Sequence, residues 1–202
     1  NAQLVLHLDH GASYEQVIQC LRNGFTSVMI DGSRLPLKEN IRVTKEVTRA
    51  AHTVGVSVEA ELGAIGGTED GMTAKANLVN VDDARCFLEE VTVEALAIGI
   101  GNAHGIYKST PNLAFDRLEQ VAALGGPALV LHGGSGIPDD MIRKAIVMGI
   151  RKINVATEVR LAFLEGFGLE VNSKDIYKAY QSAQAHARKI ISDKMSLFDT
   201  TK

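Results

Sequence analysis

Six short, mostly apolar runs rich in Val and Ile recur along the chain, and each is followed by a polar turn and an amphipathic segment. The runs are LVLHLD (4–9), SVMID (27–31), SVEAEL (57–62), ALAIGI (95–100), ALVLHG (128–133) and KINVAT (152–157). Nearly continuous hydrophobicity over such short stretches is typical of strands covered on both faces, as in a parallel sheet. The alternation therefore predicts βαβ units and an α/β fold.

The segments between the runs carry helix signals. Ser13 is a suitable N-cap for one helix and Gly24 suits its end, and Pro138 precedes Asp139 and Asp140 at the start of another. An open doubly wound sheet and a closed (β/α)8 barrel both fit this spacing. The expected helices are 13–24, 37–55, 81–91, 114–126, 138–149, about 158–170 and about 174–195.

The number of units favours an incomplete barrel. Six βα units are two fewer than a complete TIM barrel of about 250 residues contains, and six strands alone would leave two sheet edges unpaired. The chain also begins inside a strand. We therefore expect residues 1–202 to form one barrel domain that is N-terminally incomplete, with the first two βα units missing. We expect residues 63–80, with four glycines, to form a long loop of the kind that serves as a lid.

Composition excludes several classes of function. The net charge is −3 and no basic runs occur, which argues against a nucleic-acid or membrane-surface binder. No apolar run approaches the roughly 18 residues of a spanning helix, and the N-terminus lacks a signal-peptide pattern. Cys20 and Cys86 lie in helical patterns without CxxC spacing, as reduced packing residues do. These features favour a cytoplasmic protein.

Polar side chains gather at the carboxyl ends of the predicted strands, where parallel α/β proteins place their sites. Three of them, His10, His104 and His132, follow three different strands. A single histidine is more often structural, but three imidazoles with an open fourth position are the ligand set of a catalytic zinc ion. His7 lies earlier in its strand and is expected to face the core. The strand-end residues are Asp9, His10, Asp31, Glu59, Glu61, His104, His132, Asn154 and Thr157.

Two turns that lead from strands into helices, one of them rich in glycine, indicate a phosphorylated substrate. HGGSGIP (132–138) and NVATE (154–158) each lead from a strand into a helix, so backbone N–H groups there can bind an anion. Barrels commonly hold a phosphate at the loops after their last two strands. HGIYKSTP (104–111) adds Lys108 as a point charge. Either turn alone would be weak evidence, because most glycines only permit tight turns.

A metal ion held by imidazoles can activate water for hydrolysis or polarise a ketone for an aldol reaction. A Schiff-base lysine is the other route to aldol chemistry, and it should project from a strand end. Lys152 lies at the start of its strand, so we expect it on the opposite face of the barrel. The metal route is therefore favoured.

Seven motifs, in order, resemble the class II, metal-dependent ketose-bisphosphate aldolases, which include fructose-1,6-bisphosphate and tagatose-1,6-bisphosphate aldolases. The resemblance covers essentially all 202 residues. It implies reversible cleavage of a ketose bisphosphate to dihydroxyacetone phosphate and glyceraldehyde 3-phosphate by a homodimer or homotetramer. The motifs are LHLDHG, IDGS, VEAELG, GGTEDG, AHGIYK, HGGSGIP and NVATE.

The resemblance also implies roles for single residues. Asp9 resembles the catalytic acid/base, and Glu69 matches the position assigned to proton exchange at the dihydroxyacetone-phosphate carbon. Asp31 and Glu61 resemble the acidic residues behind the metal, which orient imidazoles or offer a second divalent position. The implied zinc ligands are His10, His104 and His132. The implied substrate-binding residues are Gly105, Lys108, Gly133, Ser135, Asn154 and Thr157, of which Gly105, Gly133 and Ser135 are also near positions that hold Na⁺ or K⁺.

Two departures from the family pattern leave the substrate and the activity open. Ala156 stands where many fructose-specific members carry Asp or Asn, so NVATE is closer to tagatose-type members, and Thr68 replaces an acidic residue found in some members. The N-terminal region that contacts the second phosphate is not in this sequence. Two alternatives remain: a metal-dependent hydrolase that uses Asp9 as its base, and a non-catalytic, aldolase-like partner subunit.

Overall fold

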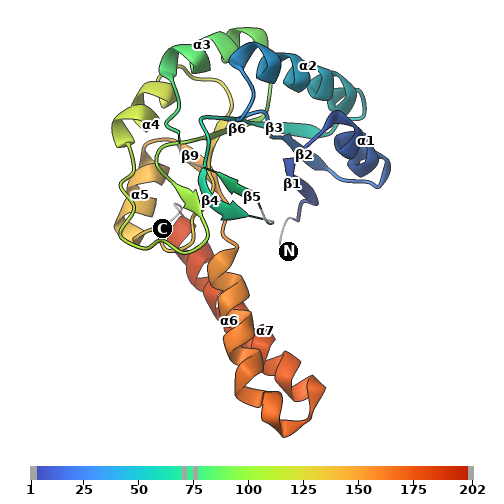
Figure 1. The fold of residues 1–202 in the computed structure, drawn as a ribbon, viewed down its shortest axis with the longest axis vertical. Coiled ribbons are helices and arrows are strands. Elements are labelled where there is room, and N and C mark those ends of the chain that lie inside the picture. Colours follow the sequence, from blue (N-terminus) through green and yellow to red (C-terminus); the bar gives the residue numbers. More distant parts are fainter. Residues whose placement is uncertain (1–3, 70–71, 75–76, 200–202) are drawn as a thin grey trace.

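The computed structural model describes residues 4–69, 72–74 and 77–199, with 68–69 and 72–74 described by their backbone alone. Its main sheet has six strands in the order β1-β2-β3-β6-β8-β9, and all neighbouring strands are parallel. The sheet is strongly curled (Figure 1). The six predicted strands are thus confirmed, with bounds β1 His7–Gly11, β2 Ser27–Ile30, β3 Ser57–Leu62, β6 Ala95–Ile98, β8 Ala128–Leu131 and β9 Ile150–Ile153.

Helices line the outer face of the curled sheet (Figure 1). Ser13 caps the first of them by accepting a hydrogen bond from the Gln16 backbone N–H, as its sequence predicts. All seven predicted helices form, with ends that differ from the expected ones by a few residues. They are α1 Tyr14–Arg22, α2 Leu37–Thr53, α3 Val81–Glu90, α4 Phe115–Ala122, α5 Asp139–Val147, α6 Thr157–Glu170 and α7 Ile176–Phe198, with a short 3-10 turn η1 at Val171–Ser173.

The two faces of the sheet differ in character because side chains alternate along each strand. In β3, Val58, Ala60 and Leu62 belong to the large apolar core beneath the helices. Glu59 and Glu61 alternate with them and are each 1% exposed on the inner face. The inner face has only a small apolar cluster, formed by Met29, Ala97 and Val130. The interior of the curl is therefore polar, and it is the place for a site.

The described residues of the segment 63–80 include two strands where the sequence predicted a loop. The segment contains β4 (Gly66–Glu69) and β5 (Met72–Ala74), which pair antiparallel, while β4 pairs in parallel with β7 (Ala103–His104). At Gly67, φ is +92° and an added Cβ would lie 2.1 Å from the backbone oxygen of His104, so only glycine fits this close approach. The prediction missed this small sheet because its third strand lies far along the chain.

Two edge strands and a projecting pair of helices lie at the periphery of the described residues. The strand order leaves β1 and β9 as the edges of the main sheet, so the fold is a curled parallel half-barrel rather than a closed one. Helices α6 and α7 pack side by side and project away from the sheet (Figure 1). Among the described helices, none is long and apolar enough to cross a membrane.

Candidate active site

An irregularity at the end of β1 brings two adjacent side chains to the same place. In a regular strand, Asp9 and His10 would point to opposite faces. Between Leu8 and Gly11, however, β1 holds one residue more than the paired part of β2, and His10 has a φ of +45°. This bulge turns the chain, so that both Asp9 and His10 reach the interior of the curl.

The three predicted histidine ligands lie together. His10 comes from β1, His104 from β7, and His132 directly follows β8. Their ring centroids are 4.7 to 5.9 Å apart, and one nitrogen of each lies within 4.8 Å of the others. His10 Nε2 and His132 Nδ1 are only 2.8 Å apart. The sheet thus gathers three imidazoles that are far apart in the sequence.

Carboxylates on the outer nitrogens orient two of these rings. His10 Nδ1 is 2.9 Å from Asp31 Oδ2, and His132 Nε2 is 2.7 Å from Glu59 Oε1. A ring N–H that donates to a carboxylate leaves the lone pair on the other nitrogen. When both rings are neutral, the lone pairs of His10 Nε2 and His132 Nδ1 are on the nitrogens that face each other, and a divalent cation held about 2 Å from each nitrogen would replace the direct contact between them. The donor set fits such an ion.

Two carboxyl groups, Asp31 and Glu61, lie behind His10. Burial opposes ionisation of Asp31, but hydrogen bonds from His10 and Ser33 lower its pKa to about 2. Burial raises the pKa of Glu61 to about 8, and the nearby Asp31 adds to this rise. Glu61 Oε2 lies 3.9 Å from His10 Nδ1 and has no hydrogen-bond partner within the described part of the chain. His10, Asp31 and Glu61 could therefore hold a cation as a second group.

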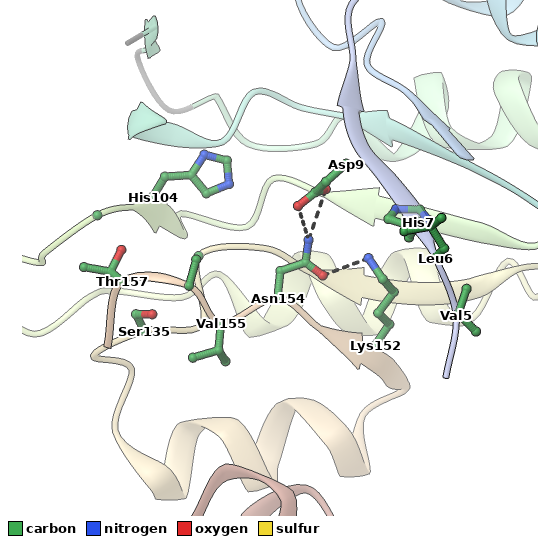
Figure 2. Close-up of a pocket in the computed structure, with 13 residues that line it drawn as sticks. Val5, Leu6, His7, Asp9, His104, Ser135, Lys152, Asn154, Val155 and Thr157 are labelled. Carbon is green, nitrogen blue, oxygen red and sulfur yellow. Dashed lines mark hydrogen bonds between the residues drawn. The ribbon is translucent and has the colours of Figure 1, made fainter. Parts of the chain in front are cut away.

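Asp9 lies beside the histidines with one side open. Asp9 Oδ1 is 4.0 Å from His10 Nε2, and its side chain is 45% exposed. The Asn154 side-chain amide donates to both carboxylate oxygens, at 3.1 and 3.2 Å, as Figure 2 shows. Asp9 is thus held in place yet accessible to a bound molecule, as a proton-transfer group must be.

A cavity of about 450 Å³ opens next to Asp9 and His104 (Figure 2). Helix α6 begins at this cavity, and Ala156 at its N-cap offers no capping side chain, so the helix end is suited to an anion. Lys108, predicted to bind phosphate, is exposed on the loop after β7. The predicted substrate-binding residues that do line the cavity are Gly105, Gly133, Ser135, Asn154 and Thr157.

The structure overturns the expectation for Lys152. Its Nζ lies 2.9 Å from Glu59 Oε2 and donates to Asn154 Oδ1 at 2.8 Å, so the side chain lines the cavity (Figure 2). The prediction was wrong because strand alternation places residue 152 on the same face as Asn154, and the long lysine side chain spans the intervening depth. In this position the Lys152 ammonium group forms an ion pair with Glu59.

Glu59 was predicted from the sequence only as a strand-end residue, without a role in the site. Burial opposes ionisation of Glu59, but the hydrogen bond from His132 and the charge of Lys152 lower its pKa to about 2. The spacing of Glu59 and Glu61 could have revealed it, because residues two apart in a strand share a face. His7 faces inward as expected, with Nδ1 2.8 Å from Ser27 Oγ. The side chains of Thr68 and Glu69 lie outside the described residues.

The chain matches one protein family over its whole length. The family model described as fructose-bisphosphate aldolase class-II matches residues 1–202. A fructose-bisphosphate aldolase of Streptococcus pyogenes serotype M3 is 44% identical over 201 residues, which is 98% of this chain and 64% of that protein. A 6-phospho-5-dehydro-2-deoxy-D-gluconate aldolase of Bacillus subtilis is 47% identical over 162 residues, which is 80% of this chain and 56% of that protein.

Solved structures share the fold. The YdjI aldolase from Escherichia coli K12 has a TM-score of 0.84 at 32% identity, covering 96% of this chain and 68% of that one. A putative fructose-1,6-biphosphate aldolase from Coccidioides immitis has a TM-score of 0.89 at 28% identity, covering 98% and 71%. The chain thus spans 64% of the length of the streptococcal relative. Since the family model matches its whole length, the chain belongs to the metal-dependent class II fructose-bisphosphate aldolase family.

Proposed function

We propose that this chain carries the site of a metal-dependent enzyme that cleaves a ketose 1,6-bisphosphate between C3 and C4. The products are dihydroxyacetone phosphate and glyceraldehyde 3-phosphate, and the reverse reaction is an aldol condensation. The observation that carries the proposal is the meeting of three imidazole nitrogens within 4.8 Å beside Asp9 and a cavity that ends at a helix N-terminus. Membership of the aldolase family supports the same reaction.

We assign His10, His104 and His132 as the ligands of a divalent ion, which the imidazole donor set favours as zinc. When bound, such an ion acts as a Lewis acid on a ketone oxygen and lowers the free energy of forming a negative charge on the neighbouring carbon. Asp31 orients His10 through its hydrogen bond, and together with Glu61 it supplies the second divalent position. Gly105, Gly133 and Ser135 are the candidates for a Na⁺ or K⁺ ion.

We assign the proton transfer at C4 to Asp9. Its carboxylate accepts the proton of the C4 hydroxyl while the electron pair of the C3–C4 bond passes to C3 and the aldehyde forms. In condensation, Asp9 returns this proton to the new hydroxyl. The Asn154 amide holds the carboxylate in place. Glu69 is our candidate for the proton exchange at C3, and Gly105, Lys108, Gly133, Ser135, Asn154 and Thr157 are our candidates for binding the dihydroxyacetone-phosphate half.

The fold supports an incomplete (β/α)8 barrel that forms one domain over residues 1–202. The six parallel strands are curled but leave β1 and β9 as edges, and the site lies at their carboxyl ends, as in complete barrels. A cytoplasmic location and a homodimeric or homotetrameric assembly stay predictions.

The reaction is tested by the products that zinc-loaded protein releases. We expect triose phosphates, measured with coupled dehydrogenases, from fructose or tagatose 1,6-bisphosphate. Release of inorganic phosphate instead would identify the hydrolase alternative. A protein that binds no zinc and gains no activity when zinc is added would be the non-catalytic partner subunit.

The substrate is tested in the same assay. Ala156 departs from the fructose-specific pattern, and the Bacillus subtilis relative is named for a different phosphorylated keto acid. The ratio of kcat/KM for tagatose 1,6-bisphosphate to kcat/KM for fructose 1,6-bisphosphate then decides which of the two sugars is the substrate. Exclusive cleavage of 6-phospho-5-dehydro-2-deoxy-D-gluconate would contradict both assignments.

A further inference from the structure

Lys152 lies at the junction of two polar chains that lead to different parts of the site. Its Nζ is 2.9 Å from Glu59 Oε2 on one side and donates to Asn154 Oδ1, at 2.8 Å, on the other. The first contact leads to the metal ligand His132. The second leads to Asp9 and also returns to His132, because Asn154 Nδ2 lies 3.3 Å from His132 Nε2. One ammonium group therefore contacts both of the groups that hold these residues.

The Glu59 branch controls the orientation of His132. The Glu59 side chain is 2% exposed, and its two oxygens have different partners: Oε1 lies 2.7 Å from His132 Nε2, and Oε2 faces Lys152. Charge-assisted contacts on both oxygens fix the plane of a buried carboxylate. Without the lysine, the buried Glu59 carboxylate would lose its cation and be left facing two imidazoles, His132 at 2.7 Å and His7 at 3.7 Å, a state that favours rearrangement. His132 would then lose the contact that fixes its tautomer.

The Asn154 branch controls the environment of Asp9. A side-chain amide has one accepting oxygen and one donating nitrogen, and a rotation by half a turn exchanges them. Because Lys152 donates to Oδ1, the NH₂ group must face Asp9, where it donates to both oxygens. An amide released from Lys152 could turn its oxygen toward the carboxylate, which would place two acceptors against each other.

We propose that Lys152 is a positioning residue that holds the metal ligand His132 through Glu59 and the acid/base group Asp9 through Asn154. The Asp9 part rests on the proposed function, whereas the His132 part concerns metal binding alone. Lys152 differs from a lysine in an ordinary surface ion pair, because its ammonium group sets both the tautomer of the His132 ring and the orientation of the Asn154 amide.

The decisive test compares zinc affinity in a set of single variants. The probe is Zn²⁺, measured by competition with a chromogenic chelator. Lys152→Met should weaken zinc binding about 10- to 100-fold, the usual effect of losing a group behind a ligand, and Lys152→Arg should recover most of it. The matched control is Lys189→Met on α7, which removes an exposed lysine paired with Asp193 in its own helix and should leave the zinc affinity unchanged.

A double-variant cycle shows whether Lys152 acts through Glu59. In a Glu59→Gln background, Lys152→Met should cause little further loss of zinc affinity, because the group through which it acts is already altered. Two independent, additive losses would overturn the proposed route. In the metal-free protein, ¹⁵N chemical shifts should show His132 protonated on Nε2, and this tautomer should become mixed in Lys152→Met.

A second variant keeps the role of Lys152 testable if Lys152→Met does not fold. Lys152→Gln keeps a hydrogen-bond donor of smaller size and replaces the methionine variant if circular dichroism shows that the latter is unfolded. Wild-type zinc affinity and an unchanged His132 tautomer in a folded variant overturn the proposal. Absence of triose phosphate from the wild-type protein would instead contradict the proposed function, and the zinc and NMR measurements would still decide the role of Lys152.

Discussion

At the scale of single residues, the site depends on which atom of each side chain is left available. His10 and His132 each have an outer nitrogen occupied by a carboxylate, so the other nitrogens, His10 Nε2 and His132 Nδ1, face each other at 2.8 Å. Asp9 has its oxygens on the Asn154 amide but remains 45% exposed. The residue types at the strand ends were predictable, because they follow apolar runs. The family resemblance implied that Asp31 orients an imidazole, but it gave Glu59 no such role, and local patterns do not show which carboxylate reaches which ring from another strand.

Substitution of Asp9 separates catalysis from metal binding. Asp9→Ala should lower kcat by about 10²- to 10⁴-fold, the usual contribution of general acid–base catalysis, and leave zinc affinity near the wild-type value because no ligand is lost. The measurements are the coupled triose-phosphate assay and chelator competition. Loss of zinc binding together with activity would show that Asp9 has a structural role instead.

The metal-free protein should lose stability as the pH rises from 6.5 to 9. Burial disfavours the charged form of His10, but the hydrogen bond to Asp31 and the charge of Glu61 raise its pKa from 6.5 to about 9. Burial raises the pKa of Glu61 from 4.5 to about 8. In this range the folded protein therefore holds more protons than the unfolded chain, and its free energy of unfolding falls with pH.

The check is a set of thermal midpoints at pH 6.5, 7.5 and 9 after treatment with a chelator. The lowered pKa values of His7 and His132 oppose the decline near pH 6.5, where their unfolded forms still bind protons, but no longer do so at pH 9. Asp31→Asn, which removes the negative charge whose hydrogen bond raises the His10 pKa, should flatten the decline. Midpoints that stay constant or rise across this range in the wild type would contradict the assignment.

At the scale of secondary-structure elements, local turns decide where the strand ends point. The bulge in β1 and the positive φ of His10 bring Asp9 and His10 to the same cavity, and Gly133 allows the loop after β8 to approach β7. The strands and helices were predictable because hydrophobic periodicity is local. The bulge and the pairing of β4 with β7 were not, since both depend on backbone contacts between distant segments.

Two glycine variants test the close approach at Gly133. Both Gly133 and Gly125 have positive φ, 64° and 72°, but an added Cβ meets the Ala103 oxygen at 2.2 Å only at Gly133 and meets nothing within 4 Å at Gly125. Gly125→Ala should cost about 1–2 kcal/mol through backbone conformation alone. Gly133→Ala should cost about 1–3 kcal/mol more because the backbone must move.

Urea unfolding measures these costs, and the KM for the bisphosphate gives a second comparison. The KM should rise for Gly133→Ala, because Gly133 lines the cavity, and stay unchanged for Gly125→Ala. Equal losses of stability in the two variants would show that the contact with Ala103 relaxes without cost.

At the scale of the whole molecule, the proposed metal ligands join parts of the sheet that are not neighbours. β1 is an edge strand, His132 follows β8 on the opposite side of the curl, and β7 belongs to the small second sheet. An ion held by all three would connect the edge of the curled sheet to its far side. Its binding should therefore stabilise the fold as a unit.

Zinc at 100 times its dissociation constant should raise the free energy of unfolding by about 2.7 kcal/mol, as expected for a ligand that binds only the folded state. Thermal or urea unfolding with and without zinc measures this gain. The gain should shrink in His104→Ala at the same zinc concentration, because one ligand is lost. An equal gain in both proteins would place the stabilising zinc elsewhere on the chain.

The sequence by itself determined the α/β class, the six parallel strands, the helices between them and the gathering of histidines and carboxylates at one end of the sheet. These features follow from short-range periodicity and from the rule that parallel strands end at the same edge. Only the tertiary structure decided that Lys152 reaches Glu59 and Asn154, that Glu59 orients His132, and that β4 pairs with β7. Such contacts depend on the curl of the sheet, which brings side chains from distant strands within hydrogen-bond range and which no local pattern records.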